Sequence, residues 1–272
     1  MDRYAVIGNP ISHSSSPAIH LSFARATGQT LDYVAIEGPP GQFAATVDEF
    51  RRGGGKGLNI TVPFKLDAFA YADERSPRAE LAGAVNAMKF ENGRALGENF
   101  DGVGLVRDVV HNLGVALRGK RVLVLGAGGA TRGALLPLLA EKPALLVIAN
   151  RTPEKAHTLA GIGAAHGDVR GSTYAALQDQ AFDAVFNATS ASLFAQLPPV
   201  PADVFAPGAL AYDMAYGRGL TPFLRVAGQA GAAMLADGVG MLAEQAAEAF
   251  AWWRGVRPDT SEVIAERSVP LV

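Results

Sequence analysis

The sequence contains no cysteine, and this absence excludes disulfide bonds, thiolate nucleophiles and cysteine-based zinc sites. It also fits a reducing compartment. Histidine is scarce as well, and the five residues show no paired spacing of metal ligands: His13, His20, His111, His157 and His166. We therefore expect no metal centre, and we interpret His13 as a loop residue that forms hydrogen bonds.

An excess of charge of one sign is also missing. The chain has 24 basic and 26 acidic residues and a net charge of -2, which argues against a broad basic face for nucleic acid. No apolar run approaches the ~18 residues needed to span a bilayer. The first residues lack the basic start and apolar core of a signal peptide. We expect a cytoplasmic protein that binds neither nucleic acid nor membrane.

Short runs of branched residues alternate with helical patterns in the first part of the chain. The length of 272 residues allows two domains, and the hydrophobic fraction of 49% allows a sizeable core. Strands are predicted at 3–8, 31–37 and 58–62, extensions of their sheet at 84–89 and 94–97, and helices at 17–27 and 43–51. This alternation predicts an α/β domain with a mainly parallel sheet.

A second α/β series begins near Lys120. Strands are predicted at 121–125, 145–149, 182–186 and 209–212, and helices at 129–140 and 153–160. The last long helix is predicted at about 240–254, where apolar residues recur at helical spacing. The fold class is therefore α/β, with two α/β domains.

A glycine-rich turn follows the predicted strand at 121–125 and opens the next helix. Glycines let the backbone turn tightly and approach a pyrophosphate, and the helix N-terminus offers free N–H groups to the phosphates. The third position of the fingerprint is Thr131 instead of glycine or alanine, so a turn that merely links strand to helix is the alternative. The strand–turn–helix context favours a dinucleotide site in a Rossmann-like domain.

The end of the following strand indicates which dinucleotide is bound. An NAD site usually has an acidic residue there for the ribose 2′-hydroxyl, and this sequence has Asn150, Arg151 and Thr152 with Lys155 beyond. Arg151 and Lys155 can pair with a 2′-phosphate, and Arg151 can stack on adenine. A solvated cluster at a helix start is the alternative. The sequence predicts NADP as the cofactor.

Polar residues gather in three further stretches, at 8–17, at 59–65, and at 83–86 with 97–102. Each lies at or just beyond the end of a predicted strand, where ligands bind in open α/β sheets. Each also has a purely structural explanation, because Ser14 and Ser16 can cap one helix and Asp101 another. Taken together, they indicate a site for a polar ligand.

Nine motifs in this order resemble the shikimate dehydrogenase family: G-N-P-x-x-H-S-x-S-P, N-x-T-V-P-F-K, G-A-V-N, N-x-D-G, G-A-G-G-A, N-R-T, N-A-T-S, Y-D-M and A-D-G-x-G-M-L. They run from Gly8 to the final helix. The resemblance implies an oxidoreductase that interconverts 3-dehydroshikimate and shikimate with NADP(H), in aromatic amino acid (chorismate) biosynthesis. It also implies a discontinuous substrate domain, residues 1–102 with 239–272, and an NADP-binding domain, residues 103–238. The chain is expected to be a monomer or a homodimer.

The resemblance also assigns the substrate residues. Lys65 is implied as the general acid, and the base in reverse, with Asp101 beside it. It assigns Ser14 and Ser16 to the substrate carboxylate, with Tyr216 nearby. Hydroxyl or carbonyl recognition falls to Asn59, Thr61, Asn86, Asp101 and Gln245. Whether Lys65 acts as a proton donor or mainly by electrostatic stabilisation stays open.

On the cofactor side the resemblance points to the glycine turn, to the end of the next strand and to three later strand ends. These residues are Gly126, Ala127, Gly128, Gly129 and Ala130, then Asn150, Arg151, Thr152 and Lys155, and finally Thr189, Met214 and Gly238 nearer the nicotinamide.

One residue departs from the family pattern at the substrate site. Phe100 stands where members usually have threonine, next to Asp101. The ring either narrows the pocket and weakens the handling of shikimate, which is the reading we favour, or it faces the core. A paralogue that acts on quinate, or a regulatory protein that binds NADPH without turnover, are the alternative functions. The presence of both Lys65 and Asp101 argues against the regulatory protein.

Overall fold

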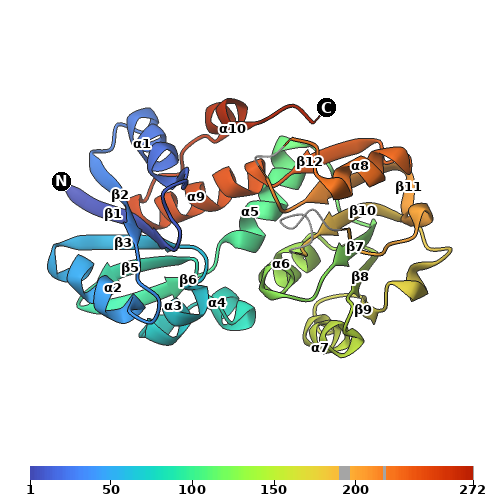
Figure 1. Ribbon diagram of the computed structural model, residues 1–272, viewed down its shortest axis with the longest axis horizontal. Helices are drawn as coiled ribbons and strands as arrows, with labels where there is room; N and C mark the ends of the chain where they lie inside the picture. Colours follow the sequence, from blue (N-terminus) through green and yellow to red (C-terminus); the bar gives the residue numbers. More distant parts are fainter. Residues whose placement is uncertain (190–196, 217–218, 272) are drawn as a thin grey trace. The chain divides into compact units, whose positions relative to one another are not determined.

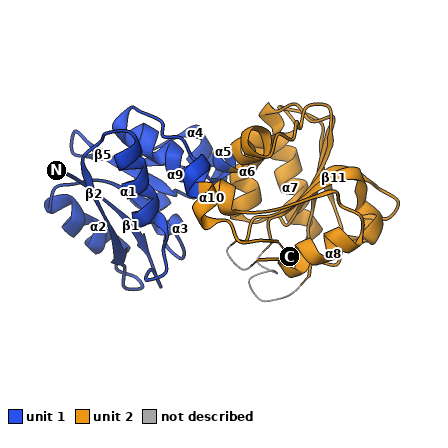
Figure 2. Cartoon of the chain, turned by 90° about the horizontal axis from the view of Figure 1, so that it is seen from above, with its two compact units in different colours: residues 1–104, 243–263 blue, residues 105–242, 264–272 orange. Residues whose placement is uncertain are grey.

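The chain is divided between two compact units, residues 1–104 with 243–263 and residues 105–242 with 264–272 (Figure 2). A computed structural model describes residues 1–189, 197–216 and 219–271 (Figure 1). Ser190, the last residue of the N-A-T-S motif, lies outside the described residues. The two-unit α/β fold class predicted from the sequence is confirmed. No helix of the described residues is long and apolar enough to span a membrane.

Unit 1 is built on a six-stranded sheet with the order β2-β1-β3-β5-β6-β4. Only β5 runs against its neighbours, since it pairs antiparallel with β3 and β6 while the other pairs are parallel. Asn92 and Gly93 join β5 to β6 with φ of 51° and 77°, the positive values that a tight hairpin turn requires. The strands are β1 (Asp2–Gly8), β2 (Leu31–Glu37), β3 (Gly55–Ile60), β4 (Glu74–Arg75), β5 (Ala87–Glu91) and β6 (Arg94–Glu98).

The helices of unit 1 include α9, which comes from the far end of the sequence. Its buried Trp253 stacks on Tyr4 of β1 with 4.8 Å between ring centroids, and its indole N–H donates to the Met88 carbonyl at 2.9 Å. These contacts fix α9 on the sheet. Helices α5, α9 and α10 have residues in both units. The helices are α1 (Ser16–Ala26), α2 (Phe43–Arg52), α3 (Lys65–Tyr71), α4 (Pro77–Ala82), α5 (Asp101–Arg107), α9 (Val239–Arg254) and α10 (Ser261–Arg267).

Unit 2 is built on a six-stranded, fully parallel sheet with the order β12-β11-β10-β7-β8-β9. This is the strand order of a Rossmann fold, and the order reverses between β7 and β10. The strands are β7 (Arg121–Leu125), β8 (Leu145–Ala149), β9 (Val169–Ser172), β10 (Phe182–Asn187), β11 (Phe205–Asp213) and β12 (Met234–Asp237). The helical segments are η1 (Asp108–Asn112), α6 (Gly129–Ala140), α7 (Pro153–Gly163), η2 (Ala175–Leu177), η4 (Ala202–Val204) and α8 (Pro222–Gln229).

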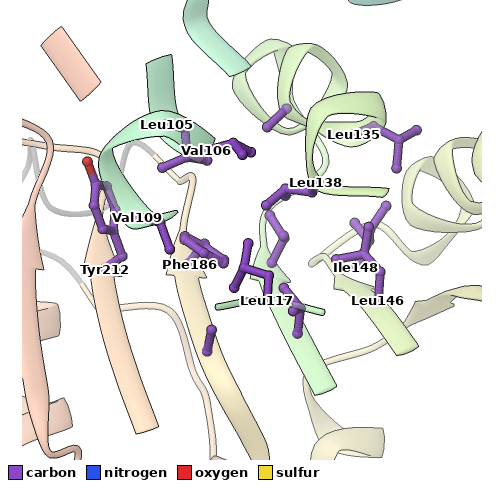
Figure 3. Packing of buried hydrophobic residues seen from close by; sticks show 14 of the residues in the cluster. Leu105, Val106, Val109, Leu117, Leu135, Leu138, Leu146, Ile148, Phe186 and Tyr212 are labelled. Atoms are coloured by element: carbon purple, nitrogen blue, oxygen red, sulfur yellow. The ribbon is translucent and has the colours of Figure 1, made fainter. Parts of the chain in front are cut away.

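Aliphatic residues of α6 and of the segment around η1 cover one face of this sheet (Figure 3). Leu138, Val109 and Phe186 are fully or almost fully buried there. One polar pair lies in the same core, because the Tyr212 hydroxyl donates to Asp108 Oδ2 at 2.8 Å. Burial and the Asp108 carboxylate both raise the pKa of Tyr212 well above its usual value, so the phenol remains a hydrogen-bond donor.

Candidate active site

Lys65 and Asp101 form an ion pair in unit 1. Lys65 is the first residue of α3 and Asp101 the first of α5, and Lys65 Nζ lies 2.6 Å from Asp101 Oδ2. Their side chains are 32% and 16% exposed, so a ligand can reach the ammonium group while the carboxylate holds it in place. Both groups that the sequence assigned to catalysis therefore meet in one place.

Asn86 holds the second oxygen of the same carboxylate. Its Nδ2 donates to Asp101 Oδ1 at 2.7 Å and lies 3.4 Å from Gln245 Oε1 on α9, while its Oδ1 accepts the Phe100 N–H at 2.9 Å. Asn86 is 2% exposed. The carboxylate is thus fixed by two side chains, which differs from the simple helix cap considered above. Lys65, Asn86, Asp101 and Gln245 form one cluster.

The loops after β1 and β3 lie side by side at the carboxyl ends of these neighbouring strands. The Asn9 N–H donates to the Val62 carbonyl at 3.0 Å. A Cβ at Gly8 would lie 2.6 Å from Thr61 Cγ2, so the close approach of the two loops requires glycine there. Thr61 follows β3 directly, and the structure brings the first two polar stretches together.

Ser14 and Ser16 lie at the start of α1 and are partly buried. The Ser14 hydroxyl accepts the Ser16 N–H at 3.3 Å, which places both hydroxyls at the N-terminal end of an 11-residue helix. Such an end favours a carboxylate through the helix dipole. Tyr216 belongs to unit 2, unlike the other predicted substrate residues, and is 47% exposed.

Phe100 is core packing in unit 1. Its side chain is buried, with 5% of its surface exposed, and lies edge to face with Trp252 at 5.8 Å between centroids. The Arg78 guanidinium lies 5.5 Å from the centre of the same ring. These contacts favour the second interpretation of Phe100, in which the ring faces the core, over the expectation that it narrows the pocket.

The glycine turn of unit 2 joins β7 to α6 at the point where the strand order reverses. Gly126 has a φ of +100°, and a Cβ there would lie 3.1 Å from Thr189 Cγ2, just beyond the end of β10. At Gly128 and Gly129, apart from the chain neighbours and the backbone of the same helix, no atom of the described residues lies within 4 Å of where a Cβ would be. These two predicted residues therefore leave open space beside the backbone at a helix N-terminus, as a pyrophosphate requires.

Thr131, the imperfect position of the fingerprint, is 1% exposed. Its hydroxyl donates to the Gly126 carbonyl at 2.8 Å, so this threonine closes the turn internally and satisfies its own polar group. Asn150, at the end of β8, accepts the Ala127 N–H at 3.3 Å and donates to the Thr152 carbonyl at 2.9 Å. The glycine turn and the end of β8 are thereby joined.

Arg151, Thr152 and Lys155 are exposed beside this turn, and the described strand end carries no acidic residue. The remaining predicted cofactor residues lie after adjacent strands. Met214 follows β11, where its N–H donates to the Asn187 carbonyl at 3.0 Å, and Gly238 follows β12, where its N–H donates to the Ala215 carbonyl at 3.2 Å. The predicted NADP residues thus line one edge of the unit 2 sheet.

Three family models match the chain. Residues 6–88 match the shikimate dehydrogenase substrate binding domain, residues 108–196 match shikimate / quinate 5-dehydrogenase, and residues 238–266 match the shikimate 5'-dehydrogenase C-terminal domain. A curated relative, the shikimate dehydrogenase (NADP(+)) of Chromobacterium violaceum, is 58% identical over 262 residues, which cover 96% of each chain. The chain belongs to the shikimate dehydrogenase family.

Solved structures share the whole fold with this chain. An Ael1 enzyme from Pseudomonas putida is 62% identical, with a TM-score of 0.97 and full coverage of both chains. The shikimate 5-dehydrogenase from Thermus thermophilus, in complex with NADP(H) and shikimate, is 33% identical with a TM-score of 0.85, and the match covers 99% of this chain and 100% of that one. Family membership agrees with the resemblance inferred from the motifs.

Sequence reasoning missed Tyr33 and His20, which lie behind the predicted substrate residues. Tyr33 donates to Asn59 Oδ1 at 2.7 Å, and the His20 ring stacks on Tyr33 at 4.3 Å between centroids. Both are buried, and both belong to elements whose sequence pattern is that of an ordinary amphipathic helix or strand. The sequence signal that could have identified them is a polar aromatic side chain at a position predicted to face the core.

Proposed function

We propose that this protein is an NADP-dependent oxidoreductase that interconverts 3-dehydroshikimate and shikimate in aromatic amino acid biosynthesis. Unit 1 binds shikimate and unit 2 binds NADP. The observation that carries the proposal is the Lys65–Asp101 pair, held by Asn86 at the other carboxylate oxygen. Family membership supports the reaction, because relatives at 54–58% identity over nearly the whole chain bear the name shikimate dehydrogenase (NADP(+)).

The residues of unit 1 suit a ring that carries one carboxylate and several hydroxyls. Ser14 and Ser16 at the α1 N-terminus receive the carboxylate, and fixed amides and carboxylates bind the hydroxyls. Such a site discriminates against analogues that leave its buried polar groups unpaired. Lys65 donates the proton to the oxygen that gains negative charge during reduction and removes it during oxidation. Asp101 holds the ammonium group in place.

The residues of unit 2 fit NADP. The open backbone at Gly128 and Gly129 leaves room for the pyrophosphate, and Arg151 with Lys155 supplies positive charge for a 2′-phosphate. Thr189, Met214 and Gly238 lie after β10, β11 and β12. We assign these three residues to the nicotinamide end of the cofactor. When bound, NADP(H) accepts or supplies the hydride.

A steady-state comparison tests the substrate and the cofactor together. The purified protein is assayed with shikimate and with quinate, each with NADP and with NAD, by the formation of reduced cofactor. The proposal predicts the highest kcat/KM with shikimate and NADP. A higher kcat/KM with quinate would instead identify a quinate-specific paralogue, and NADPH binding without turnover of either substrate would identify a regulatory protein.

A further inference from the structure

A buried tyrosine holds one of the predicted substrate residues. Tyr33 lies on β2 and is 3% exposed, and its hydroxyl donates to Asn59 Oδ1 at 2.7 Å. Asn59 lies on β3 and is 5% exposed. The sheet order β2-β1-β3 means that this hydrogen bond reaches across β1. Tyr33 therefore holds the Asn59 side chain from β2, which is separated from β3 by β1.

The Tyr33 phenol keeps its proton. Burial raises the pKa of Tyr33 well above its usual value, and the Ser16 hydroxyl partly opposes that rise. The phenol therefore retains the single proton that it donates to Asn59.

The hydrogen bond to Tyr33 decides which way the Asn59 amide faces. Oδ1 must accept from the phenol, so Nδ2 is left as the donor. Nδ2 is buried, and it finds no hydrogen-bond partner among the described residues. A buried N–H without a partner carries a desolvation penalty, which an oxygen atom of a ligand would remove.

His20 supports the Tyr33 ring by stacking against it. It is fully buried, and its ring is nearly coplanar with that of Tyr33, at an interplanar angle of 6°. Burial lowers the pKa of His20 to about 3, with a smaller opposing effect from Asn59, so the imidazole is neutral at physiological pH. Neither ring nitrogen has a partner of hydrogen-bond geometry in the described chain. The neutral imidazole therefore contributes a flat stacking surface for the Tyr33 ring.

We propose that Tyr33 is a positioning residue for substrate recognition, because its hydrogen bond fixes Asn59 as a hydrogen-bond donor to a substrate oxygen. This inference rests on the proposed function, since it assumes that Asn59 binds shikimate. Tyr33 itself acts through Asn59.

The test removes only the hydroxyl, with Tyr33→Phe, and compares KM for shikimate with kcat and with KM for NADP. The inference predicts that KM for shikimate rises about tenfold while kcat and KM for NADP stay about the same. Tyr4→Phe is the matched control. Tyr4 pairs with Tyr33 across β1 and β2 and is equally buried, but its hydroxyl lies near Arg254. If Tyr33 had a merely structural role, both variants would have a lower melting temperature, and Tyr33→Phe would have the same KM for shikimate as Tyr4→Phe.

A second comparison asks whether Tyr33 acts through Asn59. In an Asn59→Ala background, Tyr33→Phe is expected to raise KM for shikimate no further, because the amide that it positions is gone. An active wild-type enzyme whose Tyr33→Phe variant keeps the wild-type KM, or shows the same increase with and without Asn59, overturns this inference alone. A wild-type protein that does not turn over shikimate overturns the proposed function and this inference with it.

Discussion

The substitution Phe100→Thr tests whether the Phe100 ring lines the substrate pocket or packs in the core. The ring is 5% exposed and packs against Trp252 and under Arg78. Truncating a buried phenylalanine to alanine costs about 3–5 kcal/mol, and threonine restores part of the lost volume. Its hydroxyl, however, adds a polar group to an apolar contact. We therefore expect Phe100→Thr to lower the free energy of unfolding by about 3 kcal/mol.

The assay combines thermal unfolding with steady-state kinetics on shikimate. A loss of 1 kcal/mol lowers the melting temperature of a protein of this size by about 2–4 °C, so the drop should be roughly 6–12 °C. The Phe100 N–H that donates to Asn86 is unaffected, and kcat/KM should stay near the wild-type value. Phe90→Thr serves as the control, because its ring lies under Arg51 in the same unit and is only partly buried. A higher kcat/KM at an unchanged melting temperature would refute the packing argument.

Three other substitutions test the cofactor site and the packing of each unit. Arg151→Ala should raise KM for NADP roughly 10- to 100-fold and leave KM for NAD about unchanged, with the exposed Arg170→Ala as control; equal effects on both cofactors would contradict the assignment. Because the pKa of His20 is about 3 in the folded protein and about 6.5 when unfolded, its contribution to stability is present above pH 6.5 and is lost as the pH falls towards 3. Between pH 7 and pH 5 the free energy of unfolding, measured with urea, should fall by about 2 kcal/mol more for the wild type than for His20→Phe. Equal decreases for the two proteins would argue against a buried neutral imidazole. Gly240→Ala should be strongly destabilised despite its helical position, since the new methyl group would collide with the buried Asp108 carboxylate; a raised melting temperature would contradict this packing.

Much of unit 2 is predictable because parallel strands buried on both faces read as short, continuous apolar runs. The strands at 121–125 and 145–149 and the helix at 129–140 lie where the sequence places them. Unit 1 is harder. Its β5 runs antiparallel, and the local sequence signal for this direction is the Asn92-Gly93 turn. That pair indicates a hairpin only when the segments on both sides of it are already known to be strands.

The predicted catalytic residues are identifiable from motifs, but the buried residues that hold the predicted substrate residues in place are not. Lys65 and Asp101 each belong to a motif of distinctive residue types, and folding brings them within 2.6 Å. Tyr33 and His20 carry no such motif, because a single tyrosine in a strand and a single histidine in a helix do not indicate which residues they contact. Their hydrogen bonding and stacking depend on a sheet order that joins β2 to β3 across β1, which no local pattern encodes.

The rate of shikimate oxidation by wild type and Lys65→Ala tests the account most directly. General acid–base groups contribute roughly 10²–10⁴-fold, so Lys65→Ala should lose that much of kcat while binding shikimate with similar affinity, measured by calorimetry. The wild type should form NADPH steadily from NADP and shikimate. A wild-type protein that binds NADPH but never oxidises shikimate would contradict the proposed function, and a Lys65→Ala variant that keeps more than about half of the wild-type kcat would remove Lys65 from the proton transfer.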